Sequence, residues 1–237
     1  MFDLNRYQKI YNISPGLILT IGLAPIVIPL LYVGLLWSPH TDRWAVEMLR
    51  ENRPVQLLTF LALIWAGIQG LLLAKRARGE GEGALVTGFY FLFSCALIFT
   101  AMEEISWGQT FFRFATPSIL RDINAQREFS LHNIRGLQGQ AEILRGIFGL
   151  GGIIGVGLSA RAGFKKICPP EMLLPWFLII FAFAFLDFYV ELYSINTVFS
   201  WFVLRLAEVM ELLVGFSAVL FIWLNQRKLK ITWKISP

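Results

Sequence analysis

Two adjacent carboxylates, Glu103 and Glu104, end an apolar run and open the stretch AMEEISWGQTFFRFATPSILRDINAQREFSLHN. Paired carboxylates repel one another, which favours a proton on one of them and suits the pair to general acid or base chemistry. The same stretch carries His132 and Asn133. One interpretation is therefore hydrolytic: a carboxylate of the pair activates water, His132 assists as an acid or electrostatic partner, and Asn133 or another amide stabilises an oxyanion.

A second interpretation is a metal site. Glu128 and His132 are four residues apart, so a helix would present both side chains on one face. Together with Glu103 and Glu104 they could bind one divalent ion, for which a mixed carboxylate and imidazole set suits Zn, Mn or Fe. A site with three histidines is excluded, because His40 is the only other histidine and lies in a different loop.

A third interpretation assigns this loop no chemistry, with His132, Glu128 and Arg135 forming a solvated network. The aromatic residues after Trp107 and the arginine among them are typical of a bilayer interface. They predict a short interfacial helix that lies along the outer surface and ends at Pro117.

The composition is that of an integral membrane protein. Of 237 residues, 56% are hydrophobic and 16% are charged, and the mean hydropathy is +0.61, whereas about a quarter of a soluble domain is charged. The basic residues flank the apolar runs, so lipid headgroups rather than nucleic acid are the expected partners. We predict an all-α bundle in one domain, residues 1–237, with spans at 14–37, 55–74, 84–102, 143–160, 170–190 and 198–224.

The positions of the basic residues predict the orientation. Twelve Lys and Arg residues flank the spans on the side of the termini, against seven on the other side. The positive-inside rule then places both termini in the cytoplasm, and we expect a bacterial inner membrane. The first apolar run is too long for a signal-peptide core and is predicted to be a retained span.

Charged residues inside the fifth and sixth spans fall in their outer halves. The three in the sixth span, Arg205, Glu208 and Glu211, cost about 8 to 10 kcal/mol on an insertion scale. Arg205 could neutralise Glu208 as a packing pair, since the two are three residues apart. Glu211 then lacks a cation, so that it is either protonated or faces a polar cavity. Asp187 and Glu191 form a second polar stripe, unless the fifth span ends one turn earlier.

The fourth span has small residues at Gly151, Gly155 and Ser159. This spacing lets helix backbones approach closely in lipid, so a packing role is predicted for that face.

The pattern EEISWGQ followed by NAQREFSLHN resembles a family of bacterial multi-pass membrane proteins that share an EExSWGQ, NxQxE and HN stretch; that resemblance implies no activity. A remoter likeness is to CAAX-type intramembrane glutamate proteases, whose Glu-Glu pair at a helix end corresponds to Glu103 and Glu104. The chain departs from that pattern because Gly108 occupies the arginine position and a second histidine motif is missing. The resemblance therefore implies only a glutamate-activated water near the membrane surface.

We therefore expect a membrane-embedded hydrolase or transferase acting at the outer leaflet on a lipid-linked or membrane-peptide substrate. The alternatives are a proton- or cation-coupled transporter that uses the acidic stripe of the last two spans, and a non-catalytic assembly factor. Catalysis predicts a site confined to one leaflet, whereas transport predicts acidic residues that continue to the cytoplasmic side. The expected site consists of Glu103, Glu104, Glu128, His132, Asn133, Glu208 and Glu211.

The two adjacent glutamates are predicted to differ in role, because neighbouring residues on a helix point about 100° apart. Trp107 follows Glu103 by one turn and should shield it from water. We expect Glu103→Gln to abolish turnover with the fold intact, and Glu104→Gln to leave a measurable rate. Full activity in both variants would exclude glutamate catalysis by this pair.

Overall fold

The structure is a computed structural model that describes residues 4–50, 53–124, 127–131, 134, 141–193, 195 and 197–235. These residues form helices and no β-strand. The α-helices are α1 (Leu4–Tyr11), α2 (Pro15–Trp37), α3 (Asp42–Met48), α4 (Pro54–Gly79), α5 (Ala84–Glu104), α6 (Gln109–Phe112), α7 (Ser118–Ile123), α8 (Ala141–Leu158), α9 (Leu174–Leu192) and α10 (Val198–Ile235). Short 3₁₀ turns lie at Ser106–Gly108, Ala162–Phe164 and Glu171–Leu173.

Within these residues, six helices are long and apolar enough to span a membrane: α2, α4, α5, α8, α9 and α10. The protein is thus an all-α, multi-pass integral membrane protein, and its exposed leucines and phenylalanines contact lipid. The largest difference from the predicted spans is in α10, which continues past Leu224 to Ile235. A hydropathy pattern identifies only the apolar part of a helix. The Gln, Lys and Leu residues after Leu224 have high helix propensity, so the helix continues although this part is not apolar throughout.

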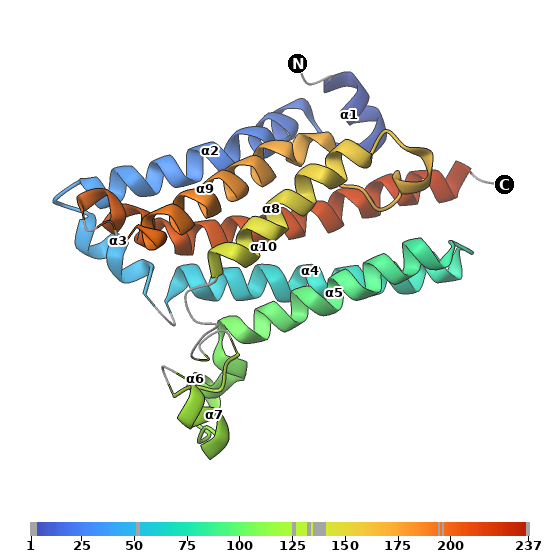
Figure 1. The fold of residues 1–237 in the computed structure, drawn as a ribbon. Helices are drawn as coiled ribbons and strands as arrows, with labels where there is room; N and C mark the ends of the chain where they lie inside the picture. The colour runs from blue at the N-terminus through green and yellow to red at the C-terminus, as the bar shows by residue number, and fades with distance from the viewer. Residues whose placement is uncertain are drawn as a thin grey trace.

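The last helix, α10, is the centre of the bundle (Figure 1). It contacts α1, α2, α4, α8 and α9, while α4 pairs with α5 and α8 pairs with α9. Met210, Leu213, Ile222 and Leu224 of α10 are almost completely buried. Every other span is therefore positioned relative to α10, directly or through one neighbour.

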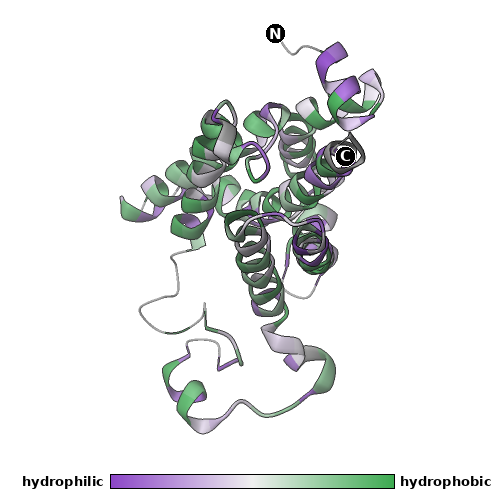
Figure 2. Ribbon diagram, turned by 90° about the vertical axis from the view of Figure 1, so that its right-hand side faces the viewer, coloured by the Kyte–Doolittle hydropathy of each residue, from purple (hydrophilic) through white to green (hydrophobic). Residues whose placement is uncertain are grey.

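The two ends of the bundle differ. Figure 1 shows α1 and the C-terminus at one end, called here the terminal side, and α3 at the other. The short helices α6 and α7 lie beside the bundle beyond the end of α5, as Figures 1 and 2 both show. The predicted interfacial helix corresponds to α6, but it ends at Phe112 rather than at Pro117, because Arg113 adopts a left-handed φ of 52°. Pro117 instead precedes α7.

The predicted contact face of the fourth span is correct at Gly155, where a Cβ atom would lie 2.8 Å from the Pro169 ring, and wrong at Gly151. A Cβ atom on Gly151 would meet nothing within 4 Å. A Cβ on Gly149 would lie 2.8 Å from the backbone nitrogen of Phe181, and one on Gly152 would lie 2.2 Å from the Phe177 ring. The spacing of small residues indicated correctly that α8 packs closely, but several glycines in one helix allow more than one such face.

A loop closes the terminal side of the bundle between α8 and α9. The Tyr90 hydroxyl donates to the Lys166 carbonyl at 2.6 Å, and the Lys166 ammonium pairs with both oxygens of Glu82 at 2.7 and 2.8 Å. The amide of Asn225 donates to the carbonyl of Cys168 at 3.3 Å. Three spans, α5, α8 and α10, are thus connected at this end by one loop.

One buried hydrogen bond joins α2 to α9. Pro25 has no N–H, so the carbonyl of Ile21 loses its donor within α2. The indole N–H of Trp176 donates to that carbonyl at 2.8 Å. Pro25 removes one hydrogen bond from α2 and thereby leaves the Ile21 carbonyl free to accept from α9.

We expect Trp176→Phe to lower the free energy of unfolding by about 0.5–1 kcal/mol, the usual range for such a bond in a membrane protein. In a Pro25→Ala background, the backbone at position 25 regains an N–H that can donate to the Ile21 carbonyl. Trp176→Phe should then lower the free energy of unfolding by a smaller amount. Unfolding of the four proteins of this cycle in mixed micelles measures the difference. An equal cost in both backgrounds would contradict the assignment.

Candidate functional site

A buried guanidinium joins three spans. Arg145, near the start of α8, hydrogen-bonds to Asp187 of α9 through Nη2 and to Oε1 of Glu211 of α10 through Nη1, the latter at 2.6 Å. Arg145 and Asp187 are 6% and 5% exposed. Arginine donates in a fixed planar fork, so it can bind two carboxylates from different helices at once. Its Nε has no hydrogen-bond partner among the described residues.

Glu104 brings a fourth span to this ion-pair cluster. It lies at the last position of α5 and interacts electrostatically with Glu211, Glu208 and Arg145. Glu142, one turn before Arg145 on α8, is buried and interacts electrostatically with Glu191, Asp187 and Arg145. Among the described residues, carboxylates from α5, α8, α9 and α10 thus lie around Arg145. We call Glu104, Arg145, Asp187, Glu208 and Glu211 the acidic cluster.

The structure corrects one expectation about these charges. Glu211 does have a cation, namely Arg145, which approaches from a helix far away in the sequence. The helix that carries the second polar stripe continues to Leu192, and Asp187 is buried in it. Whether the membrane span itself ends one turn earlier stays a prediction from the sequence. The Arg205 guanidinium lies 6.0 Å from the centre of the Trp201 ring, a cation–π contact.

Glu103 points to a different environment from Glu104. Its Oε1 accepts from the indole N–H of Trp107 at 2.6 Å, and its Oε2 accepts from the backbone N–H of Leu131 at 2.7 Å. Glu103 is 7% exposed, so Trp107 shields it as the sequence indicated. Both oxygens serve to hold the loop after α5 against the helix end.

An unusual turn makes these contacts possible. Ser106, Trp107 and Gly108 all have positive φ, at 46°, 55° and 82°, and so reverse the chain directly after α5. A Cβ on Gly108 would also lie 2.9 Å from the Phe112 ring. An arginine in this position would combine left-handed strain with a steric clash, so the turn favours glycine here.

Other polar residues of the EEISWGQ and NAQREF segments hold the same loop. The Gln109 amide donates to Thr116 Oγ1 at 2.7 Å and accepts from the Phe129 N–H at 2.7 Å. Asn124 is fully buried; it donates to the Ser130 carbonyl at 2.8 Å. These side chains replace the backbone partners that an irregular loop lacks. We call residues 106–124 and 127–131 the loop cap.

Glu128 is also engaged within the loop cap, since its Oε2 accepts from the Ser106 hydroxyl at 2.7 Å. His132, Asn133 and Arg135 lie outside the described residues. No group of three His, Cys, Asp or Glu side chains in the described ranges is arranged as a metal site. The metal site of Glu103, Glu104, Glu128 and His132 therefore remains a prediction from the sequence.

Sequence reasoning missed two residues that hold the site together, Arg145 in the acidic cluster and Gln109 in the loop cap. Arg145 was visible as a lone cation at the start of an apolar run, and a charge in a span indicates a buried partner. Its partners could not be named, because they lie on other helices. Gln109 gave no such signal. The position of a glutamine in a predicted loop does not show whether its amide bonds to other protein groups or to water.

Comparisons with models of known protein families, with curated proteins and with solved structures found no match for this chain. The chemistry of the site therefore follows from its own residues.

We expect Arg145→Gln to lower the free energy of unfolding by about 3–5 kcal/mol, because it leaves buried carboxylates without their cation. The triple variant Arg145→Gln, Asp187→Asn, Glu211→Gln should recover much of that loss, since the two carboxylates that hydrogen-bond to the guanidinium are then neutral as well. Arg161→Gln, at an exposed position of the terminal side, is the matched control. Denaturant titration in mixed micelles gives the values; equal effects of the Arg145 and Arg161 substitutions would contradict the ion-pair account.

Proposed function

We propose that the protein is a membrane-embedded hydrolase or transferase that acts on a lipid-linked or membrane-peptide substrate, with Glu104 as its general base. The observation that carries this proposal is the position of Glu104, at the junction of the helix end, the loop cap and the acidic cluster. Glu103 is committed to two N–H donors, whereas Glu104 interacts with Glu208 and Glu211. The geometry favours Glu104 over Glu103 for proton transfer.

The surrounding charges support this role. Arg145 holds Asp187 and Glu211 in place, and its fixed charge lies within electrostatic range of Glu104. The neighbouring Glu208 and Glu211 repel a negative Glu104, so accepting a proton from water or a substrate hydroxyl relieves that repulsion. The oxygen freed of its proton would attack the carbonyl or phosphoryl centre of the substrate, the bond from that centre to the leaving group would break, and His132 would give the leaving group a proton. His132 and Asn133 keep their predicted roles as acid and oxyanion donor.

The distribution of polar groups favours catalysis over transport. Three hydroxyl groups in the described spans are bonded within their own helices: Thr59 to the Val55 carbonyl, Ser94 to that of Tyr90, and Ser217 to that of Val214. These three hydroxyl groups donate to backbone carbonyls and are not links between the acidic cluster and the terminal side. A site confined to one end of the bundle suits a reaction near one leaflet.

A second candidate is a proton- or cation-coupled transporter, and one observation favours it: carboxylates from several spans surround a single arginine. An excess of acidic groups in low dielectric calls for a proton or another cation. For either function we infer that the termini are cytoplasmic, that the acidic cluster lies toward the outer leaflet, and that the membrane is a bacterial inner membrane. A non-catalytic assembly factor would show neither activity.

The proposal is tested with purified protein in nanodiscs made from bacterial polar lipids and doped with a fluorogenic transmembrane peptide. Mass spectrometry follows loss or transfer of lipid headgroups, and fluorescence follows peptide cleavage. We expect Glu104→Gln to lower the rate about 10²–10⁴-fold, the usual contribution of a general base. Glu103→Gln should lower it less, through a loosened loop cap, and Glu80→Gln on the exposed end of α4 should leave it unchanged.

Full activity of Glu104→Gln would contradict the assignment of the base, and loss of activity in Glu103→Gln alone would support the arrangement expected from the sequence. If the wild type turns over no lipid or peptide, a pH-sensitive dye in proteoliposomes tests the transporter. Proton flux that is lost in Glu211→Gln would then replace the catalytic proposal.

A further inference from the structure

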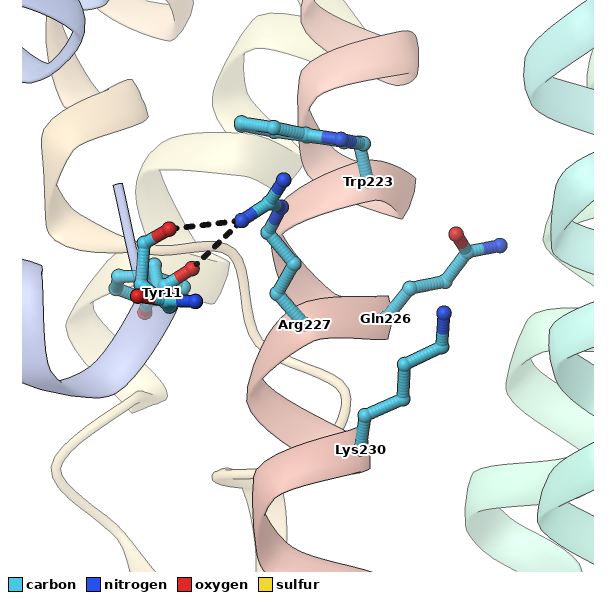
Figure 3. A pocket seen from close by; sticks show the side chains of 6 residues that line it. Tyr11, Trp223, Gln226, Arg227 and Lys230 are labelled. Atoms are coloured by element: carbon cyan, nitrogen blue, oxygen red, sulfur yellow. Dashed lines mark hydrogen bonds between the residues drawn. The ribbon is translucent and has the colours of Figure 1, made fainter. Parts of the chain in front are cut away.

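A polar recess of about 300 Å³ lies on the terminal side, away from the acidic cluster. It is formed where the end of α1 meets one face of α10, because residues 223, 226, 227 and 230 recur every three or four positions. Figure 3 shows how these side chains lie. The lining residues are Tyr11, Asn12, Trp223, Gln226, Arg227 and Lys230.

Arg227 is held rigidly in this recess. Its Nη1 donates to the carbonyls of Tyr11 at 3.3 Å and Asn12 at 2.8 Å, and its guanidinium lies 4.4 Å from the centre of the Trp223 ring (Figure 3). A stacked, anchored guanidinium keeps its charge and its remaining N–H groups in a fixed orientation. Little side-chain freedom is then lost when those groups bind an anion.

The charges that line the recess are positive. Arg227 and Lys230 each contribute one positive charge, and burial raises the pKa of the Tyr11 phenol, which therefore stays neutral at physiological pH. Glu171, whose charge reaches Tyr11, lies 3.7 Å from Arg6 and accepts from the Tyr7 hydroxyl at 3.1 Å. The recess thus attracts an anion and offers it several N–H donors.

The recess lies at the depth of lipid headgroups. The sixteen residue-to-residue steps from Glu211 to Arg227 correspond to about 24 Å of helix, close to the roughly 30 Å hydrocarbon thickness. With the acidic cluster near one boundary of the hydrocarbon, Arg227 and Lys230 lie near the other. Trp223 is the kind of aromatic residue that anchors a helix at this boundary.

We propose that this recess binds the phosphate group of an anionic lipid, with Arg227 and Lys230 as its cations. Phosphate is the anion for which arginine and lysine together are suited, the first through directed N–H donors and the second as a mobile point charge. Basic recesses between membrane helices at this depth recognise such headgroups. The bound lipid would stabilise the contact between α1 and α10. This role does not depend on a reaction at the acidic cluster.

The test uses full-length protein in nanodiscs of phosphatidylcholine with increasing fractions of phosphatidylglycerol, and follows thermal unfolding. We expect phosphatidylglycerol to stabilise the wild type in a saturable way. Lys230→Gln should raise the half-saturating fraction about five-fold, the effect of one cation near a charged lipid surface. Lys75→Gln, an exposed lysine at the same end of α4, should leave it unchanged, and Lys230→Arg should restore the wild-type value.

A parallel arm adds inorganic phosphate to nanodiscs of phosphatidylcholine alone. Stabilisation there that depends on Lys230 would support the phosphate site and identify a free anion as its occupant. Equal effects of Lys230→Gln and Lys75→Gln on the phosphatidylglycerol response would overturn the proposal, because the lipid would then act through general surface charge. Absence of any response to either phosphate source would also overturn it.

Discussion

The bundle depends on one arginine placed where lipid surrounds the helices. A guanidinium in low dielectric is stable only if carboxylates reach it, and Asp187 and Glu211 do so from two other spans. Their attraction to Arg145 fixes the relative positions of α8, α9 and α10 at the end opposite the termini. The glycine face of α8 allows this approach, since Gly149 and Gly152 let the backbones of α8 and α9 come close enough for the ion pair.

The two adjacent glutamates lie in different environments, and we propose a chemical role only for Glu104. Glu103 ties the loop cap to the helix end, and the turn at Ser106–Gly108 brings Trp107 back to it. Glu104, pointing elsewhere on the same helix, meets the acidic cluster. The two glutamates of one sequence motif therefore have different partners, and the amides of Gln109 and Asn124 belong to the loop cap.

The sequence was sufficient to predict the membrane spans and the end of the bundle where the charged residues lie. Both predictions rest on local properties of the chain, namely the hydrophobicity of each segment and the free-energy cost of burying a charge. It could not reveal which carboxylate Arg145 binds, since that depends on how helices rotate against α10. The same limit applies to Gly151, which faces open space although it has the spacing of a contact residue. Asn124 and Gln109 were visible as amides, but only the folded loop shows that their partners include backbone groups.

The central claim is that the acidic cluster shares a proton that Glu104 can accept and release, while Glu103 remains a hydrogen-bond acceptor. Infrared spectroscopy of the protein in lipid, recorded at neutral pH in heavy and light water, detects a protonated carboxyl group through its C=O stretch. Our account predicts such a band in the wild type, weakened or shifted in Glu104→Gln and unchanged in Glu103→Gln. A band that is absent from the wild type, or that disappears only in Glu103→Gln, would contradict it.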